Sequence, residues 1–261
     1  MIGVFDSGLG GLSVLDAISR TLPHSDLLYL ADTAHVPYGE KSDAYIRERV
    51  LRIGQYLAGQ GCQQIVVACN TATAAAVAAL RDALPQIRVV GIEPGIKPAV
   101  AASKSGRIAV LTTESTARSE RLSRLIHRYA GPVRVDVLPC PGWATRVETL
   151  KLDDPGFAGA AARLLEPVLA AGADQVVLGC THYAFLAPVL EPIVEGRARL
   201  VDVADAVARQ CLRLAGEAAN RHGRLTLLAT AHPERLQLAL AVLNLGQLAA
   251  RLTGPASSVD V

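Results

Sequence analysis

Two cysteines occupy matching positions in two similar stretches of the chain. The stretches "QIVVACNTATAAA" (64–76) and "DQVVLGCTHYAFL" (174–186) each run from an apolar, strand-like segment through a cysteine into polar residues. A glycine precedes Cys69 and Cys180 by the same eight residues, so the two stretches lie in register 111 residues apart. A thiol that starts a helix forms thiolate more readily, because the helix end carries partial positive charge. The pattern predicts a matched pair of acid–base or nucleophilic groups.

A core role is the alternative for any cysteine that ends a strand, because thiols are among the most buried side chains. Cys62, Cys140 and Cys211 have no adjoining helix start of this kind, and we assign them to the core. A hydrolase nucleophile is a second alternative, but it would give only one member of the Cys69 and Cys180 pair a role.

Other residues that could do chemistry also follow predicted strands. His182 lies two residues after Cys180 and could accept or polarise a proton. Asp6 and Ser7 end the first strand, and Asp32 ends the second. Either aspartate could simply cap the next helix. The glycines that closely follow Asp6 favour a ligand-binding role for it.

The glycine loop "GLGGLS" is close to the G-x-G-x-x-G fingerprint of dinucleotide-binding folds, and Asp32 lies 24 residues beyond Gly8. However, Ser13 occupies the third glycine position, and Asp6 would lie unfavourably close to a pyrophosphate. We therefore expect neither nicotinamide nor flavin binding.

Short apolar runs alternate with helical patterns and must position these residues. The runs are IGVF, LLYLA, IVVA, RVVGI, RIAVL, VRVDVL, QVVLG, RLVDV and RLTLLAT. Helical spacing is clearest over 43–57, 157–171 and 205–219. This alternation predicts an α/β fold with parallel sheets covered by helices on both faces.

An internal repeat predicts how the strands divide. Besides the two cysteine stretches, "GVFDSGLGGLSVL" has a counterpart in "RIAVLTTESTARS" at an offset of 106 residues. We expect two pseudo-symmetric doubly wound parallel-sheet domains facing each other across a central cleft, with ligands at the carboxyl ends of the strands. Pro and Gly in "GIEPGIKPAV" mark one crossing and "VDVADA" a return. The predicted lobes are 1–94 plus 205–261, and 95–204.

Composition narrows the functional classes. No window of 18 residues is apolar throughout, and no basic leader precedes the first strand, so we expect a cytoplasmic protein without a membrane span. The five cysteines are an odd number without zinc-ligand spacing, which predicts reduced thiols and no metal. A net charge of +2 without a basic run argues against nucleic-acid binding.

Taken together, these motifs resemble the glutamate racemases of the cofactor-independent Asp/Glu racemase family. The resemblance covers nearly the whole chain, through IGVFDSGLGGLSVL, ADTAHVPYGEKS, VVACNTATA, GIEPGIKPA, CPGWATRVE, LGCTHYAFL and VDVADA. It implies interconversion of L- and D-glutamate without a cofactor, supplying D-glutamate for bacterial peptidoglycan. We also expect glutamate as a small-molecule substrate, no nucleic-acid or membrane partner, and either a monomer or a homodimer.

The same resemblance implies a two-base mechanism, in which Cys69 serves the D-isomer and Cys180 the L-isomer from opposite sides of the α-carbon. It makes Asp6, Glu148 and His182 assistants, with Asp32 a further candidate. The substrate-binding residues that it implies are Asp6, Ser7, Pro37, Tyr38, Gly39, Asn70, Thr71, Thr113, Thr116, Thr181 and His182.

The sequence departs from the family pattern at a few positions. His35 stands where a basic residue, often Arg, is usual, and Ala184 where Pro is common. Trp143, Thr145 and Arg146 replace a more apolar pattern near the expected Glu148. Two other functions stay open, namely a racemase acting on aspartate or a hydantoin and a non-catalytic amino-acid-binding protein.

Overall fold

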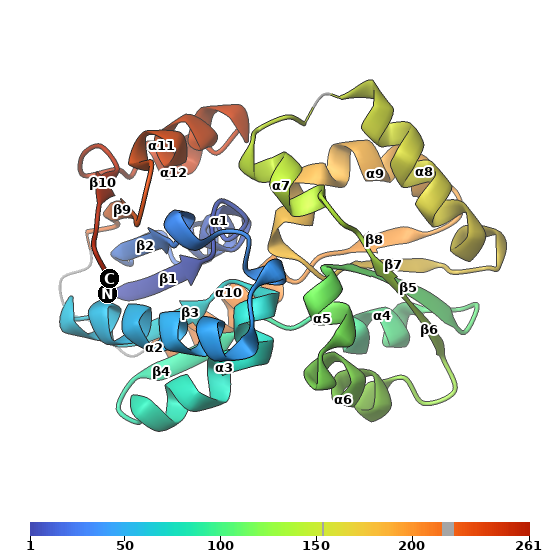
Figure 1. Cartoon of the computed structure of the whole chain (residues 1–261), viewed down its shortest axis with the longest axis horizontal. Helices are drawn as coiled ribbons and strands as arrows, with labels where there is room; N and C mark the ends of the chain where they lie inside the picture. The colour runs from blue at the N-terminus through green and yellow to red at the C-terminus, as the bar shows by residue number, and fades with distance from the viewer. Residues whose placement is uncertain (153, 216–221) are drawn as a thin grey trace. The chain divides into compact units, whose positions relative to one another are not determined.

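The computed structural model describes residues 1–152, 154–215 and 222–261 (Figure 1). The chain forms two compact units, which we describe separately. The first comprises Met1–Ile92 and Ala204–Val261, and the second comprises Glu93–Val203. Among the described residues, no helix combines the length and hydropathy needed to cross a bilayer.

The first unit is built on a six-stranded parallel sheet. Its strands are β1 (Ile2–Asp6), β2 (Leu27–Ala31), β3 (Gln64–Val67), β4 (Arg88–Gly91), β9 (Leu225–Ala229) and β10 (Ser257–Ser258), in the order β10-β9-β2-β1-β3-β4. Every residue of β1, β2 and β3 is buried, as expected for strands covered on both faces.

Helices cover this sheet. They are α1 (Leu12–Thr21), α2 (Asp43–Gly59), α3 (Asn70–Ala83), α10 (Ala204–Leu214), α11 (Pro233–Val242) and α12 (Gly246–Ala249), with short 3-10 segments η1 (Thr33–His35) and η2 (Tyr38–Glu40). Helix α2 packs against α3, and α1 packs against α10. Helix α2 begins after Ser42, whose side chain accepts a hydrogen bond from the N–H of Tyr45.

The second unit is built on a four-stranded parallel sheet. Its strands are β5 (Arg107–Thr112), β6 (Arg134–Pro139), β7 (Gln175–Leu178) and β8 (Arg199–Val201), in the order β6-β5-β7-β8. Its helices are α4 (Ile96–Ala102), α5 (Glu114–Arg118), α6 (Glu120–Tyr129), α7 (Trp143–Glu148), α8 (Pro155–Ala170) and α9 (Ala187–Val194), with the 3-10 segment η3 (Thr181–Leu186).

Alternate residues of β5 enter two different cores. Ala109 and Leu111 belong to one hydrophobic cluster, and Ile108 and Val110 belong to another. Because successive side chains of a strand point to opposite faces, each face of this sheet carries its own core. The sheet is therefore buried on both sides, as the sequence predicts for a doubly wound fold.

The internal repeat reappears as a shared strand order. The order β2-β1-β3-β4 in the first unit matches β6-β5-β7-β8 in the second. Consequently Cys69 and Cys180 follow equivalent strands, β3 and β7. The prediction of two parallel α/β halves and all nine predicted strands are confirmed, whereas the two-residue β10 was not predicted.

One predicted helix is described only in part. The pattern over 205–219 predicts a helix, and α10 accounts for it up to Leu214. Residues 216–221 lie outside the described part of the chain.

Candidate active site

In the first unit, strand register brings the chemical residues to one edge of the sheet. Phe5 of β1 pairs with Val67 of β3, and Asp6 pairs with Ala31 of β2. Because the strands are parallel, Asp6, Asp32 and Cys69 emerge at the same carboxyl edge. This edge is where open α/β sheets bind ligands.

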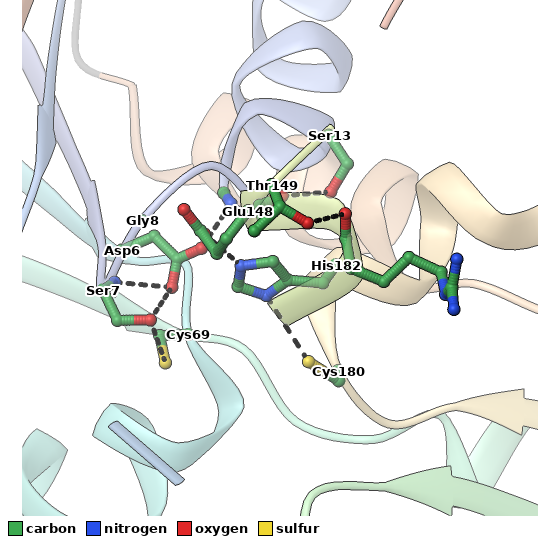
Figure 2. A network of polar contacts seen from close by, with 12 residues as sticks. Asp6, Ser7, Gly8, Ser13, Cys69, Glu148, Thr149, Cys180 and His182 are labelled. Atoms are coloured by element: carbon green, nitrogen blue, oxygen red, sulfur yellow. Dashed lines mark hydrogen bonds and ion pairs between the residues drawn. The ribbon is translucent and has the colours of Figure 1, made fainter. Parts of the chain in front are cut away.

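Asp6, Ser7 and Cys69 form a hydrogen-bonded chain at this edge (Figure 2). The Asp6 carboxylate accepts the N–H of Ser7 at 2.7 Å and the N–H of Gly11 at 2.5 Å. The Ser7 hydroxyl lies 3.3 Å from Asp6 Oδ1 and 4.0 Å from Cys69 Sγ. The carboxylate is thereby linked to the thiol through one hydroxyl.

The glycine loop contacts the Asp6 carboxylate through the N–H of Gly11. A Cβ at Gly11 would lie 2.6 Å from Asp6 Cβ and 2.8 Å from Tyr29 Oη, so only glycine lets the N–H approach Asp6 so closely. The sequence suggested that the loop lets backbone approach a ligand. In the structure, Gly11 approaches a side chain of its own unit, next to the start of α1.

Cys69 precedes α3 in extended conformation, and Asn70 and Thr71 form the first turn of that helix. All three side chains are buried, with Asn70 only 5% exposed. Neither Nδ2 nor Oδ1 of Asn70 hydrogen-bonds another described residue. Buried polar atoms are almost always paired, so this amide next to the thiol indicates a place for a polar ligand.

Asp32 and Tyr38 form a second buried group in this unit. The Tyr38 hydroxyl donates to Asp32 Oδ2 at 2.6 Å, and Pro37 and Gly39 flank the tyrosine. Burial, and then the Asp32 charge, raise the pKa of Tyr38 well above its ordinary value, so its phenol stays neutral.

Sequence reasoning missed the residue that completes this group. Arg49 of α2 forms a two-point ion pair with Asp32, through Nε at 3.0 Å and Nη2 at 2.8 Å. A signal was available in the sequence, since Arg49 falls on the same helical stripe as the buried Ile46, Val50 and Ile53. A charge on an apolar stripe needs a buried partner.

In the second unit, Cys180, His182 and Glu148 form one chain of polar contacts (Figure 2). His182 Nε2 lies 2.5 Å from Glu148 Oε1, and Nδ1 lies 3.6 Å from Cys180 Sγ. Burial opposes the charged imidazole, but hydrogen bonds to Cys180 and Glu148 outweigh it and raise the pKa of His182 well above its ordinary value. A protonated His182 then donates toward the sulfur.

Two local contacts support this arrangement, one between Gly179 and β5 and one between α7 and η3. Gly179 N–H donates to Leu111 O at 2.7 Å, and a Cβ at Gly179 would lie 2.6 Å from the same oxygen. Trp143 of α7 packs edge-on against Tyr183 of η3, with ring centroids 5.4 Å apart. The departure from the family pattern at Trp143 thus anchors the helix that ends in Glu148.

The remaining predicted residues lie in the second unit. Thr113 caps α5, and its Oγ1 accepts the N–H of Thr116 and lies 3.1 Å from the Thr116 hydroxyl. Thr181 is buried in the first turn after Cys180. The structure thus brings Cys180, Glu148 and His182 together and joins Thr113 to Thr116.

The other three cysteines are in core settings. Burial raises the pKa of Cys62 to about 11, and the pKa values of Cys140 and Cys211 to about 12. All five cysteines are reduced thiols. Within the described ranges, no group of three or more His, Cys, Asp and Glu side chains is arranged to hold a metal ion.

Known proteins are similar to this chain in sequence and in fold. The sequence model described as Asp/Glu/Hydantoin racemase matches residues 2–211. Glutamate racemase of Pseudomonas aeruginosa (strain UCBPP-PA14) is 50% identical over 82% of this chain and 80% of its own length. That of Ectopseudomonas mendocina (strain ymp) is also 50% identical, over 83% and 82%.

A solved structure shows the same similarity over the whole fold. Escherichia coli glutamate racemase, crystallised with L-glutamate and the activator UDP-MurNAc-Ala, is 32% identical. The two structures superpose with a TM-score of 0.87 over 100% of this chain and 98% of the other.

Proposed function

This chain belongs to the Asp/Glu/Hydantoin racemase family, and on that premise we propose that it interconverts L-glutamate and D-glutamate without a cofactor. The observation that carries the proposal is the matched pair of thiols, each at the carboxyl end of an equivalent strand and at the start of a helical segment. The names of relatives at 50% identity support glutamate as the substrate.

Inversion of an α-carbon needs a base on one face and an acid on the other. In the proposed reaction, the Cys180 thiolate takes the α-proton of L-glutamate, so that an S–H bond forms and the electron pair stays on the α-carbon. The Cys69 thiol then delivers its proton to the opposite face and becomes the thiolate. The D-to-L reaction runs through the same steps in reverse.

The contacts in each unit suit this division of roles. The Cys69 thiol is placed to donate toward Ser7, whose hydroxyl donates to the Asp6 carboxylate. At the other thiol, a protonated His182 held by Glu148 donates toward Cys180. In the L-to-D direction Cys69 must act as the donor and Cys180 as the acceptor of a proton, and these contacts match those two roles.

Substrate binding needs partners for two carboxylates and an amino group. We assign the unpaired Asn70 amide to this task, because it is buried beside Cys69 and can both donate and accept. Ser7, Thr71 and Thr181 add hydroxyls, and the N-termini of helical segments favour anions. The substrate-binding roles of Pro37, Tyr38, Gly39, Thr113 and Thr116 belong to the same proposal.

The D-glutamate formed would serve bacterial peptidoglycan synthesis, as the resemblance implies. Replacement of the host racemase gene by a gene for this chain tests that role. We expect growth without added D-glutamate, and the Cys69→Ser variant should not support it.

The reaction itself is tested by circular dichroism with purified protein, after dialysis against a chelator and without added pyridoxal phosphate or nucleotide. L-Glutamate and D-glutamate should each lose their signal toward the racemate, and L-aspartate and a 5-substituted hydantoin should react far more slowly. Faster reaction of either alternative would assign the chain to another substrate of the family.

A binding protein without catalysis is the remaining alternative. It predicts that a variant lacking both thiols keeps ligand affinity and biological role. Calorimetric titration of glutamate into the Cys69→Ser/Cys180→Ser double variant, together with the growth test, separates the two cases. Growth supported by that double variant would overturn the catalytic proposal.

A further inference from the structure

An ion pair is buried deep in the first unit, where charged side chains are rare. Asp32 is fully buried, and Arg49 is only 7% exposed. The Arg49 guanidinium donates to both carboxylate oxygens of Asp32, from Nε at 3.0 Å and from Nη2 at 2.8 Å. Its Nη1 donates to Val261 O at 2.5 Å. Such a pair is costly to desolvate, so it is poor evidence for a purely stabilising role.

This ion pair lies at the same carboxyl edge of the sheet as Cys69, because Asp32 follows β2, Cys69 follows β3, and only β1 lies between these two strands. Asp32 Oδ2 also accepts the Tyr38 hydroxyl at 2.6 Å, and Tyr38 belongs to the same hydrophobic cluster as Cys69. A negative charge on Cys69 contributes to the raised pKa of Tyr38, after burial and Asp32. Arg49 therefore contacts Asp32, Asp32 contacts Tyr38, and the phenol of Tyr38 is within electrostatic range of the Cys69 sulfur.

We propose that Arg49 is a positioning residue for Cys69. Arg49 neutralises Asp32, so that the thiol can form thiolate near this carboxylate, and it fixes Tyr38 through the same carboxylate. The inference rests on the proposed function, in which Cys69 is the base for D-glutamate. In this inference Asp32 holds Tyr38 by a hydrogen bond and balances the charge of Arg49. Asp32 then takes no part in proton transfer.

The balance of charge between Asp32 and Arg49 explains how this ion pair would affect the ionisation of the Cys69 thiol. The titratable and charged groups that the described contacts give at this edge of the first unit are Asp6, which reaches Cys69 through Ser7, and the connected set of Asp32 after β2, Tyr38 from η2 and Arg49 from α2. With Arg49 present, Asp32 adds no net charge to this set. Without Arg49, a lone carboxylate would repel a thiolate, and without Asp32, a lone guanidinium would attract it.

The experiment measures the pH dependence of alkylation of each thiol by iodoacetamide, read as modified peptides by mass spectrometry. Cys180 is an internal control in every sample, because it is buried to a similar degree, at 8% exposed against 6% for Cys69. The readout needs no turnover, so failure of this inference is distinguishable from failure of the racemase proposal.

Two single variants should shift the midpoint pH of Cys69 alkylation in opposite directions. Arg49→Met should raise the midpoint pH for Cys69 by about one unit or more, and Asp32→Asn should lower it, while Cys180 stays unchanged. The Asp32→Asn/Arg49→Met double variant should return close to the wild type. Arg52→Met, one turn further along α2 in an exposed pair with Glu48, is the matched control and should leave both thiols unchanged.

The opposite signs distinguish charge balance from loosened packing. Equal shifts at both thiols, or no shift at Cys69 in either single variant, would overturn the proposal. If Arg49→Met does not fold, Asp32→Asn decides alone, and an unchanged or raised midpoint for Cys69 would contradict the inference.

Discussion

His182 Nε2 lies 2.5 Å from Glu148 Oε1, while the other ring nitrogen faces the Cys180 sulfur at 3.6 Å. The imidazole thus contacts a carboxylate with one nitrogen and a thiol with the other. The raised pKa of His182 follows from both contacts, which together outweigh the cost of burial. The structure therefore holds a buried cation beside the sulfur of one thiol.

Replacement of Glu148 by Gln should weaken this cation and slow the reaction that depends on Cys180. We expect elimination from the L-form of a glutamate analogue with a leaving group on its β-carbon to fall roughly 10- to 100-fold. Elimination from the D-form should change far less. Both are measured as initial rates of product release.

Glu166→Gln is the matched control for this variant. Glu166 pairs with Arg197 on the surface of the same unit, and its replacement should leave both rates unchanged. Equal losses for the two enantiomers in Glu148→Gln would contradict a specific role at Cys180.

The raised pKa of His182 also predicts how stability depends on pH. The folded protein binds this proton more tightly than the unfolded chain, so the stabilisation is complete below the unfolded pKa of about 6.5. It is lost as the pH rises through the higher folded value. The free-energy difference between wild type and His182→Asn, measured by urea unfolding, should be larger at pH 6 than at pH 9. A gap that grows with pH would reverse the assigned sign.

Replacement of Asn70 should weaken the use of glutamate without lowering the stability of the fold. Because its amide atoms bond no other described residue, Asn70→Ala should leave the free energy of unfolding unchanged or raise it. The kcat/KM for glutamate should nevertheless fall roughly 10- to 100-fold, through lost hydrogen bonds to a charged substrate.

Thr73→Val, in the same helix, should behave in the opposite way. The Thr73 hydroxyl bonds Val67 O at 3.2 Å, so this variant should lose about 1 kcal/mol of stability and keep its activity. Loss of stability in Asn70→Ala would show that the amide is structural.

The sequence predicted the strands and the paired thiols because both depend on local pattern. Apolar runs marked every strand of β1 to β9, and the equal glycine-to-cysteine spacing marked Cys69 and Cys180. Strand β10 consists of two serines, Ser257 and Ser258, and carries no hydrophobic signal at all.

The partners of the site residues were harder to predict, because folding brings them together from distant positions. Arg49 meets Asp32 from 17 residues away, and no local pattern pairs them. The task of Gly11 depends on distances of 2.6 Å and 2.8 Å to two side chains, which sequence spacing does not encode. Glu148 and His182 lie 34 residues apart, and the family resemblance named both as assistants without predicting their contact.

The central claim is that two thiols act as separate bases, one for each enantiomer. Racemisation needs both, so Cys69→Ser and Cys180→Ser should each lower its rate by orders of magnitude, because a serine hydroxyl is a far weaker acid and base. Elimination from the β-substituted glutamate analogue needs only one base.

The most direct measurement is therefore elimination by both single variants from both enantiomers of that analogue. Cys69→Ser should process only the L-form, Cys180→Ser only the D-form, and the double variant neither. Similar rates for both enantiomers in both single variants would contradict two separate bases and require a single mobile base in their place.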